Sequence, residues 1–363
     1  MDALFNLFKI KFDKLDELLN EGNNITPDST INIYFNLETI WRLMININNE
    51  KLLRTKENRI IETTSNIINI AAHYRLWCKK HNLSSRVVLY TPSFNKMKYK
   101  NTMFNPKYRY HTLFKYNEDA TFFICQDTIR ESIQMAKTIL EYIDGVYLIE
   151  GYDVEPSLIP LVCKNKFNEN DINFIISTDV YDFQYSNFDF YVFRPKKDDT
   201  FLIRKNMLIK TMKEIEGIKN ETNVSDDLFS FVLSILGDRN RNIEKIKKVG
   251  LSSILTLVSK AIDKNLISDT TRSIELLIKS LKEEHRTPVL NNFYCIDLDF
   301  QYTTLQSSSK LRLEYQIKDR FDMDSLIKLN NSYFIDSPLQ LFELSPEIVK
   351  PNNKGQVKRR NPF

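Results

Sequence analysis

The stretch "IEGYDVEPSLIPLV", residues 149–162, ends an apolar run and begins a segment with helical spacing. The run VYLIE (146–150) predicts a buried strand, and Pro156 suits the first turn of a following helix. Glu150 and Asp153 lie at this junction. Functional groups of open parallel sheets gather at the carboxyl ends of the strands, so the junction is a candidate site at the end of a central strand.

Strand-like and helix-like segments alternate through the first two-thirds of the chain. This alternation predicts an α/β fold with a mostly parallel central sheet flanked by helices. The expected strands are 30–36, 86–90, 120–125, 146–150, 173–177 and 190–193, and the expected helices between them include 37–48, 55–81 and 127–143.

After about residue 205 the strand pattern gives way to helices, expected at 206–216, 226–236, 251–264 and 270–284 and followed by an irregular segment beyond 290. We therefore expect an α/β domain over 1–205 and a helical subdomain over 206–290. A C-terminal segment over 291–350 would pack on the core. The basic residues 351–363 predict a disordered tail.

Composition excludes several classes of protein. The 363 residues include only seven glycines, and neither GxGxxG nor GxxxxGK[ST] occurs, which argues against glycine-rich nucleotide loops. The four cysteines form no CxxC pair and there are four histidines, so a zinc framework is not expected. Buried free thiols in the cytoplasm are the better interpretation. No apolar run is long enough to span a membrane, which predicts a soluble protein.

Residues 86–116, the basic aromatic segment, contain no Asp or Glu but many cations and rings. Cations neutralise phosphates and aromatic faces stack on unpaired bases, so this composition favours nucleic-acid binding. The alternative is a partly buried loop whose rings belong to the core. The candidate binding residues here are Lys96, Lys98, Lys100, Lys107, Tyr108 and Arg109.

Four motifs resemble those of flap endonucleases and 5′→3′ exonucleases, the superfamily that includes ribonuclease H of T-even phages. "FNPKYRYHTLFKY" (104–116) resembles the P-x-Y-K-x-x-R element of the family's arch, and "IEGYDVEPSLIPL" resembles E-A-D-D-V-I-A-T-L. "FIISTDVYDFQ" (174–184) resembles a strand ending in S-G-D-x-D-x-x-Q. "LGDRNRNIEKIKKVGLSSILTLV" (236–258) resembles G-D-x-S-D-N-I-P-G-V-x-G-I-G-x-K-T-A. Because the four motifs occur in the same order as in the family, the resemblance implies a PIN-like 5′-nuclease domain with a helix–hairpin–helix at about 237–258.

The resemblance implies a catalytic cluster of carboxylates. Two divalent ions about 4 Å apart assist attack of water on a phosphodiester, and Mg²⁺ or Mn²⁺ takes hard oxygen ligands. The residues that match the family's catalytic, metal-binding acids are Glu150, Asp153, Asp179 and Asp238.

About half of the family's acids are replaced. Tyr152, Tyr181 and Arg241 stand at three acidic positions, Asn36 stands at the end of the first strand, and the second strand offers no acid. An arginine opposes metal occupancy by charge repulsion, which predicts one bound ion or none. Three acids near lost positions could compensate in part: Glu38, Glu155 and Asp182.

Each surviving acid also has a local explanation. Asp153 could cap a helix that begins with Pro156. Asp179 could serve the turn after a strand, and Asp238 could be a turn or N-cap residue after Gly237. Only their shared order and placement favour a common site.

The hairpin would bind a phosphate without reading base sequence, through backbone N–H groups and the next helix N-terminus. Lys248 replaces the family's first hairpin glycine, and a plain helical hairpin of the core is the alternative. The candidate contacts are Lys247, Lys248, Gly250 and Ser252.

These features yield three hypotheses. The first is a nucleic-acid-binding protein that engages branched or 5′-ended DNA, or RNA–DNA, with weakened or lost cleavage. Its richness in Asn, Ile and Lys suggests an AT-rich genome and a phage or viral replication or transcription assembly in the host cytoplasm. The second is an active Mg²⁺-dependent 5′ nuclease or ribonuclease H. The third is a structural subunit that binds protein.

Overall fold

The structure is a computed structural model of the chain. It describes residues 18, 29–37, 39, 56–92, 105–106, 120–140, 143, 145–151, 155–165, 167–196, 199–216, 224–238, 241–246, 250–263 and 270–306. The expected helix 37–48 lies almost wholly outside these residues, and Glu38 and the basic tail 351–363 lie wholly outside them. No helix within the described ranges is both long and apolar enough to cross a membrane.

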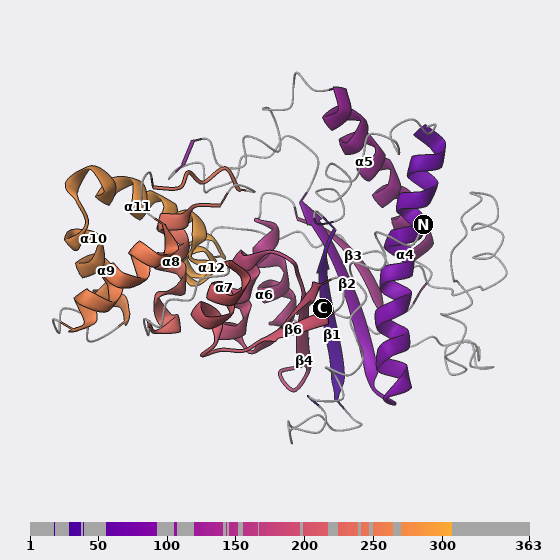
Figure 1. Cartoon of the computed structure of the whole chain (residues 1–363). Helices are drawn as coiled ribbons and strands as arrows, with labels where there is room; N and C mark the ends of the chain where they lie inside the picture. The colour runs from indigo at the N-terminus through magenta and orange to yellow at the C-terminus, as the bar shows by residue number, and fades with distance from the viewer. Residues whose placement is uncertain are drawn as a thin grey trace, which may run out of the picture.

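A six-stranded sheet forms the centre of the fold, in the order β3-β2-β1-β4-β5-β6 (Figure 1). The first five strands run parallel and β6 pairs antiparallel with β5. Their bounds are β1 Thr30–Asn36, β2 Ser84–Pro92, β3 Val146–Gly151, β4 Ile172–Ile176, β5 Phe190–Lys196 and β6 Asp199–Ile203. The predicted α/β class is confirmed, but β3 is an edge strand and not a central one.

Two long helices cover one face of the sheet. The helix α4 (Lys56–Lys80) matches the expected helix, whereas α5 (Ala120–Leu140) begins inside the segment that we expected to be a strand. The run ATFFIC (120–125) is therefore wrongly predicted as a strand. A short apolar run rich in aromatic and β-branched residues suits either state, and here it continues into a 21-residue helix.

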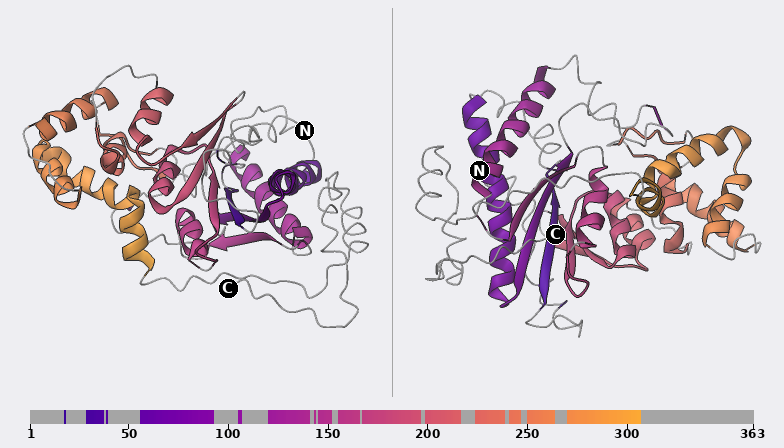
Figure 2. Two further views of the ribbon diagram at one scale, coloured as in Figure 1. Left: turned by 90° about the horizontal axis from the view of Figure 1, so that it is seen from below. Right: turned by 180° about the vertical axis from the view of Figure 1, so that it is seen from behind.

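Alternation along the strands divides the interior into two cores, one on each face of the sheet. Figure 2 shows helices on both sides of the sheet. Ile33 and Phe35 of β1 point toward α4 and α5, while Tyr34 between them points to the other face. On that face Tyr34 packs with η4 (Pro156–Leu158), α6 (Ile159–Lys164), η5 (Val180–Phe188) and α7 (Leu208–Glu216). This period of two gives each side of the sheet its own apolar layer.

The second core extends from the sheet into the helical part. One buried cluster contains residues of the sheet and residues as far along the chain as Leu298. The elements of the helical part are η6 Asp226–Leu228, α8 Phe229–Leu236, α9 Leu251–Asp263, α10 Thr270–Ser280, α11 Glu283–Ile296 and α12 Leu298–Gln306.

Two expectations about the C-terminal third are wrong. The expected helix 270–284 is divided between α10 and α11, and residues 291–306 are helical, not irregular. Pro288 lies inside α11, and because proline usually interrupts a helix, the sequence around it does not indicate one. Its buried residues Val289, Phe293 and Ile296 nevertheless follow helical spacing, and that spacing was the available signal.

The buried Trp77 of α4 should be a main support of the first core. Its ring centroid lies 5.7 Å from that of Phe174 and 6.2 Å from that of Phe193. We expect Trp77→Ala to lower the free energy of unfolding by about 3–5 kcal/mol, because the cavity cannot close fully. Urea unfolding followed by circular dichroism measures this change. The control Met207→Ala, at an exposed residue, should change stability by about 0.5 kcal/mol or less; equal effects of both substitutions would contradict the packing.

Three of the four cysteines are buried free thiols, as predicted: Cys78, Cys163 and Cys295. Burial raises the pKa of the Cys78 and Cys295 thiols to about 12. The reactive thiolate is therefore scarce at neutral pH. In Cys125→Ser, which retains these three thiols, we expect no labelling by a thiol reagent in the folded state and three labels after unfolding, counted by mass spectrometry. Labelling at the folded-state pH without denaturant would disprove this burial.

Candidate functional site

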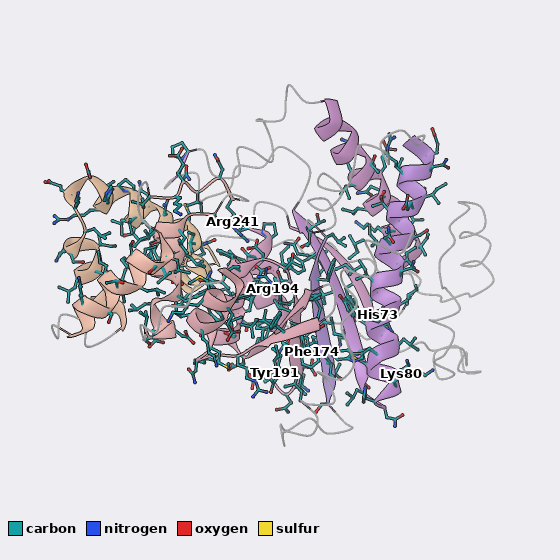
Figure 3. All side chains as sticks on the ribbon, in the orientation of Figure 1. His73, Lys80, Phe174, Tyr191, Arg194 and Arg241 are labelled. Atoms are coloured by element: carbon teal, nitrogen blue, oxygen red, sulfur yellow. The ribbon has the colours of Figure 1, made fainter. Side chains whose placement is uncertain are left out.

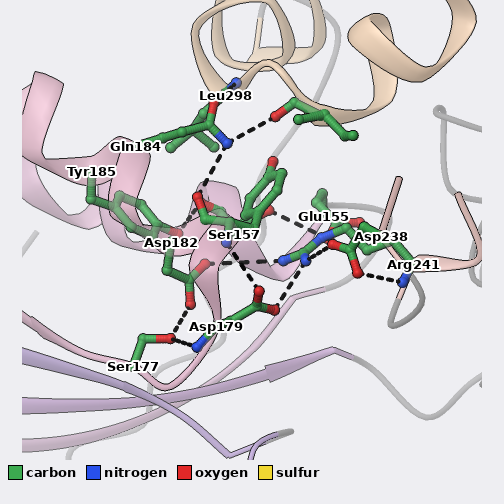
Figure 4. Close-up of polar contacts among 12 residues, drawn as sticks. Glu155, Ser157, Ser177, Asp179, Asp182, Gln184, Tyr185, Asp238, Arg241 and Leu298 are labelled. Carbon is green, nitrogen blue, oxygen red and sulfur yellow. Dashed lines mark hydrogen bonds and ion pairs between the residues drawn. The ribbon is translucent and has the colours of Figure 1, made fainter. Parts of the chain in front are cut away.

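The side chain of Arg241 lies among four carboxylates beyond the carboxyl end of β4 (Figure 4). Its Nη1 donates to Oδ2 of Asp179 at 3.0 Å and also to Asp238. Glu155 Oε1 lies 3.9 Å from Nε and Asp182 Oδ1 lies 4.0 Å from Nη2, so these two are ion pairs without hydrogen-bond geometry. The Arg241 side chain is only 2% exposed. We call these five residues the Arg241 cluster.

A tight turn after α8 brings Arg241 back over Asp238. Gly237 has φ +71°, and a Cβ there would lie 2.6 Å from the backbone oxygen of Ile243 and the backbone nitrogen of Lys245. Asp238 and Ile243 exchange backbone hydrogen bonds of 2.9 and 2.8 Å, which close the turn. The Arg241 N–H donates to the Asp238 backbone carbonyl at 3.2 Å. Glycine is thus required at 237, and the turn fixes Arg241 beside its first partner.

The loop after β4 supplies two more carboxylates. Asp179 caps η5, because its side chain accepts from the Tyr181 N–H at 3.1 Å. Ser177 donates to Asp182 at 2.6 Å and orients that buried carboxylate. The local explanation for Asp179 is therefore correct, but it does not exclude the common site: the same carboxylate both caps the 3-10 helix and binds Arg241.

Glu155 and Asp182, the nearby acids considered as substitutes, both lie in the cluster. Glu155 directly precedes η4 and makes no side-chain cap there. Its Oε1 instead accepts from the Ser157 hydroxyl at 3.4 Å and faces Arg241. The two substitutes are almost completely buried, whereas Asp179 and Asp238 are slightly exposed.

Tyr181 lies against the flat face of the guanidinium, with Arg241 Cζ 3.6 Å from the ring centroid. This geometry is a cation–π contact in a buried setting. Burial raises the pKa of the Tyr181 phenol, and the neighbouring Arg241 lowers it only in part. The phenol is therefore neutral at physiological pH and does not replace the negative charge of a carboxylate.

Divalent ions do not fit the cluster beside Arg241. A guanidinium carries donors only and occupies the space between the carboxylates that a metal would need. Within the described part of the chain, no group of three or more His, Cys, Asp or Glu side chains is placed to hold a metal ion.

The four predicted metal ligands are only partly brought together. Asp179 and Asp238 meet through Arg241. Glu150 pairs in register with Thr91 at the carboxyl edge of β3, three strands from β4 and thus roughly 14 Å away across the sheet. The side chain of Glu150 and all of Asp153 and Tyr152 lie outside the described residues.

Most predicted nucleic-acid contacts also lie outside the described residues: Lys96, Lys98, Lys100, Lys107, Tyr108, Arg109, Lys247 and Lys248. Gly250 and Ser252 lie at the start of α9, where Ser252 is exposed. Among the described residues, no atom lies within 4 Å of a Cβ built on Gly250, so packing against them does not require glycine there.

Sequence reasoning missed two contacts of the basic aromatic segment. Asn105 donates to the backbone carbonyl of Asn242 at 3.2 Å, which joins the segment to the Arg241 turn. Arg86 at its start binds Asp171 and Asn32 near the amino ends of the interior strands, and its guanidinium lies over the Phe167 ring. Arg86 is therefore a structural residue. Local composition did not show this because its partner is 85 positions away.

Comparison with solved structures shows which known fold the chain shares. No family model and no curated protein matches the sequence. A 5′-exonuclease of bacteriophage T5 with bound zinc ions is 14% identical, with a TM-score of 0.51, over 84% of this chain and 98% of that one. A bacteriophage T5 protein co-crystallized with metal ions is also 14% identical, with a TM-score of 0.50, over 86% and 99%. Together with the sheet and the four ordered motifs, these likenesses show that the chain has a fold of the flap endonuclease and 5′-exonuclease type.

Proposed function

We propose that the protein binds branched or 5′-ended nucleic acid on a 5′-nuclease fold without efficient cleavage. The observation that carries this proposal is the buried guanidinium of Arg241. It donates hydrogen bonds to Asp179 and Asp238, two of the acids expected to bind metal. Hydrolysis by this fold depends on ions that stabilise the attacking and leaving oxygens. A guanidinium has no coordination position for water and cannot supply that chemistry.

Charge at the cluster also opposes close approach of a scissile phosphate. Among the described residues, one guanidinium faces four carboxylates, so the formal charges of these five side chains leave a negative excess. Two divalent ions in place of Arg241 would neutralise the four carboxylates, whereas Arg241 alone does not. A phosphodiester is therefore repelled from this edge of the sheet, and binding must come from other surfaces.

The basic aromatic segment and the 243–258 hairpin are the surfaces proposed to bind. The Asn105–Asn242 hydrogen bond supports this, because it holds part of the segment beside the turn that precedes the hairpin. DNA or an RNA–DNA hybrid with a single-stranded end suits stacking rings among cations. The T5 structures support a phage setting, and we propose action in a replication or transcription assembly.

An active Mg²⁺- or Mn²⁺-dependent nuclease is the second candidate. It is favoured by the convergence of Asp179 and Asp238, whose side chains keep 15% and 13% exposure. Glu150 and Asp153 would complete its reduced site. A structural subunit that binds protein is the third candidate, and it predicts no affinity for nucleic acid.

A cleavage assay separates the first two candidates. We expect no turnover of a 5′-labelled flap duplex or of an RNA–DNA hybrid with Mg²⁺ or Mn²⁺, because Arg241 excludes the ions. Denaturing gels measure the products. The control is Asp179→Asn: metal-dependent turnover that disappears in this variant would establish an active site and overturn the proposal.

Salt-dependent binding tests the proposed surface. We expect the wild-type affinity for a flap duplex to fall steeply with salt, and the double variant Lys107→Ala, Arg109→Ala to lower the log–log slope by about 2. Fluorescence anisotropy measures both. Lys80→Ala, at the distant end of α4 (Figure 3), is the matched control and should leave the slope unchanged. Absence of binding at low salt would support the third candidate instead.

A further inference from the structure

We propose that Arg241 holds the helical part on the sheet through its ion pairs with the four acids of the Arg241 cluster, in the structural role that a divalent ion has in a carboxylate cluster. We call this set of ion pairs the clasp. This inference goes beyond the proposed function, because it concerns which cation stabilises the fold. It holds whether or not nucleic acid binds.

The cluster joins three separate segments of the chain. Glu155 precedes η4, Asp179 and Asp182 follow β4, and Asp238 lies in the turn between α8 and α9. Arg241 reaches all four acids from the helical part, and Figure 3 shows it where that part adjoins the sheet. Without a cation, these acids would repel one another across the junction.

The enclosure of the guanidinium resembles that of a structural ion. Its edge faces carboxylates, its plane lies on the Tyr181 ring at 3.6 Å, and almost none of it meets solvent. Such a charge is costly to bury and remains only where opposite charges surround it. The surroundings thus specify a cation at this point, and the chain supplies one covalently.

Two glutamines extend the clasp to the last helices. Gln301 of α12 donates to the Tyr181 hydroxyl at 3.1 Å. Gln184 of η5 donates to the carbonyl of Ile296 at 3.1 Å, and its Oε1 accepts from the N–H of Leu298 and from Ser230. The segment that binds Arg241 is therefore also the segment on which α11 and α12 are fixed.

The test exchanges the covalent cation for a free one. The melting temperature of the wild type should be the same in EDTA and in Mn²⁺. Arg241→Ala should melt roughly 10 °C lower in EDTA, because four acids lose the neighbouring guanidinium, and should recover most of that loss in Mn²⁺. Electron paramagnetic resonance of Mn²⁺ should detect binding to the variant and none to the wild type.

Arg86→Ala is the matched control. It also removes a guanidinium from a salt bridge, but within the described part of the chain Arg86 forms an ion pair with one carboxylate, that of Asp171. This variant should be destabilised and should gain nothing from Mn²⁺. Equal recovery of both variants would show a general effect of the ion and overturn the proposal.

Three other results would overturn the clasp. They are Mn²⁺ stabilising the wild type as strongly as the variant, Arg241→Ala melting like the wild type, or a destabilised variant without Mn²⁺ recovery. If Arg241→Ala does not fold in EDTA, refolding in Mn²⁺ decides: folding only with the ion supports the clasp, and failure in both refutes it. The cleavage assay is unaffected by any of these outcomes, so the two proposals can fail separately.

Discussion

The buried guanidinium of Arg241 among four carboxylates is the interaction on which the arrangement of this protein depends. Moving a charge out of water is expensive, and the cost is recovered only when opposite charges and hydrogen bonds surround it. Here the partners come from the sheet side and the helical side, so neither part alone satisfies the charge. Removal of one partner from a buried ion pair typically costs about 3–5 kcal/mol, a large share of the stability of a domain.

A covalently held cation differs from an exchangeable one in what it can do. A guanidinium is always charged, donates in a fixed plane and offers no open position. It can neutralise acids and hold loops together, but it cannot bind a water molecule and lower its pKa as a metal does. The proposed clasp therefore uses only the charge-pairing role of a cation, which a guanidinium can supply.

Local sequence patterns predicted most of the strands and helices, but they did not predict the order of the strands in the sheet. Five of the six strands and the helix α4 follow from apolar runs and their period. The edge position of β3 did not follow, because strand order is fixed by packing across the sheet and not by local sequence. The start of α5 was missed since a short apolar run suits two states.

Residues of the candidate site that belong to the motifs could be predicted from the sequence, whereas contacts between residues far apart in the chain could not. The replacement of an acid by Arg241 was visible in the sequence, and the structure places its guanidinium among four carboxylates. Its partners Glu155 and Asp182 were visible only as neighbours of lost positions. The contacts of Asn105 with Asn242 and of Arg86 with Asp171 join residues 137 and 85 positions apart, beyond the reach of local composition.

The replacements at positions 181 and 241 are complementary to each other. Each removes a carboxylate from the motif pattern, and they lie 60 positions apart in the chain, yet the phenol ring lies flat against the guanidinium. Independent loss of two acids would leave two unrelated side chains in a charged pocket. Instead one replacement supplies the positive charge that the remaining acids need, and the other supplies the face that encloses it. The two replacements therefore act together in one buried contact, which supports the structural role proposed for the Arg241 cluster.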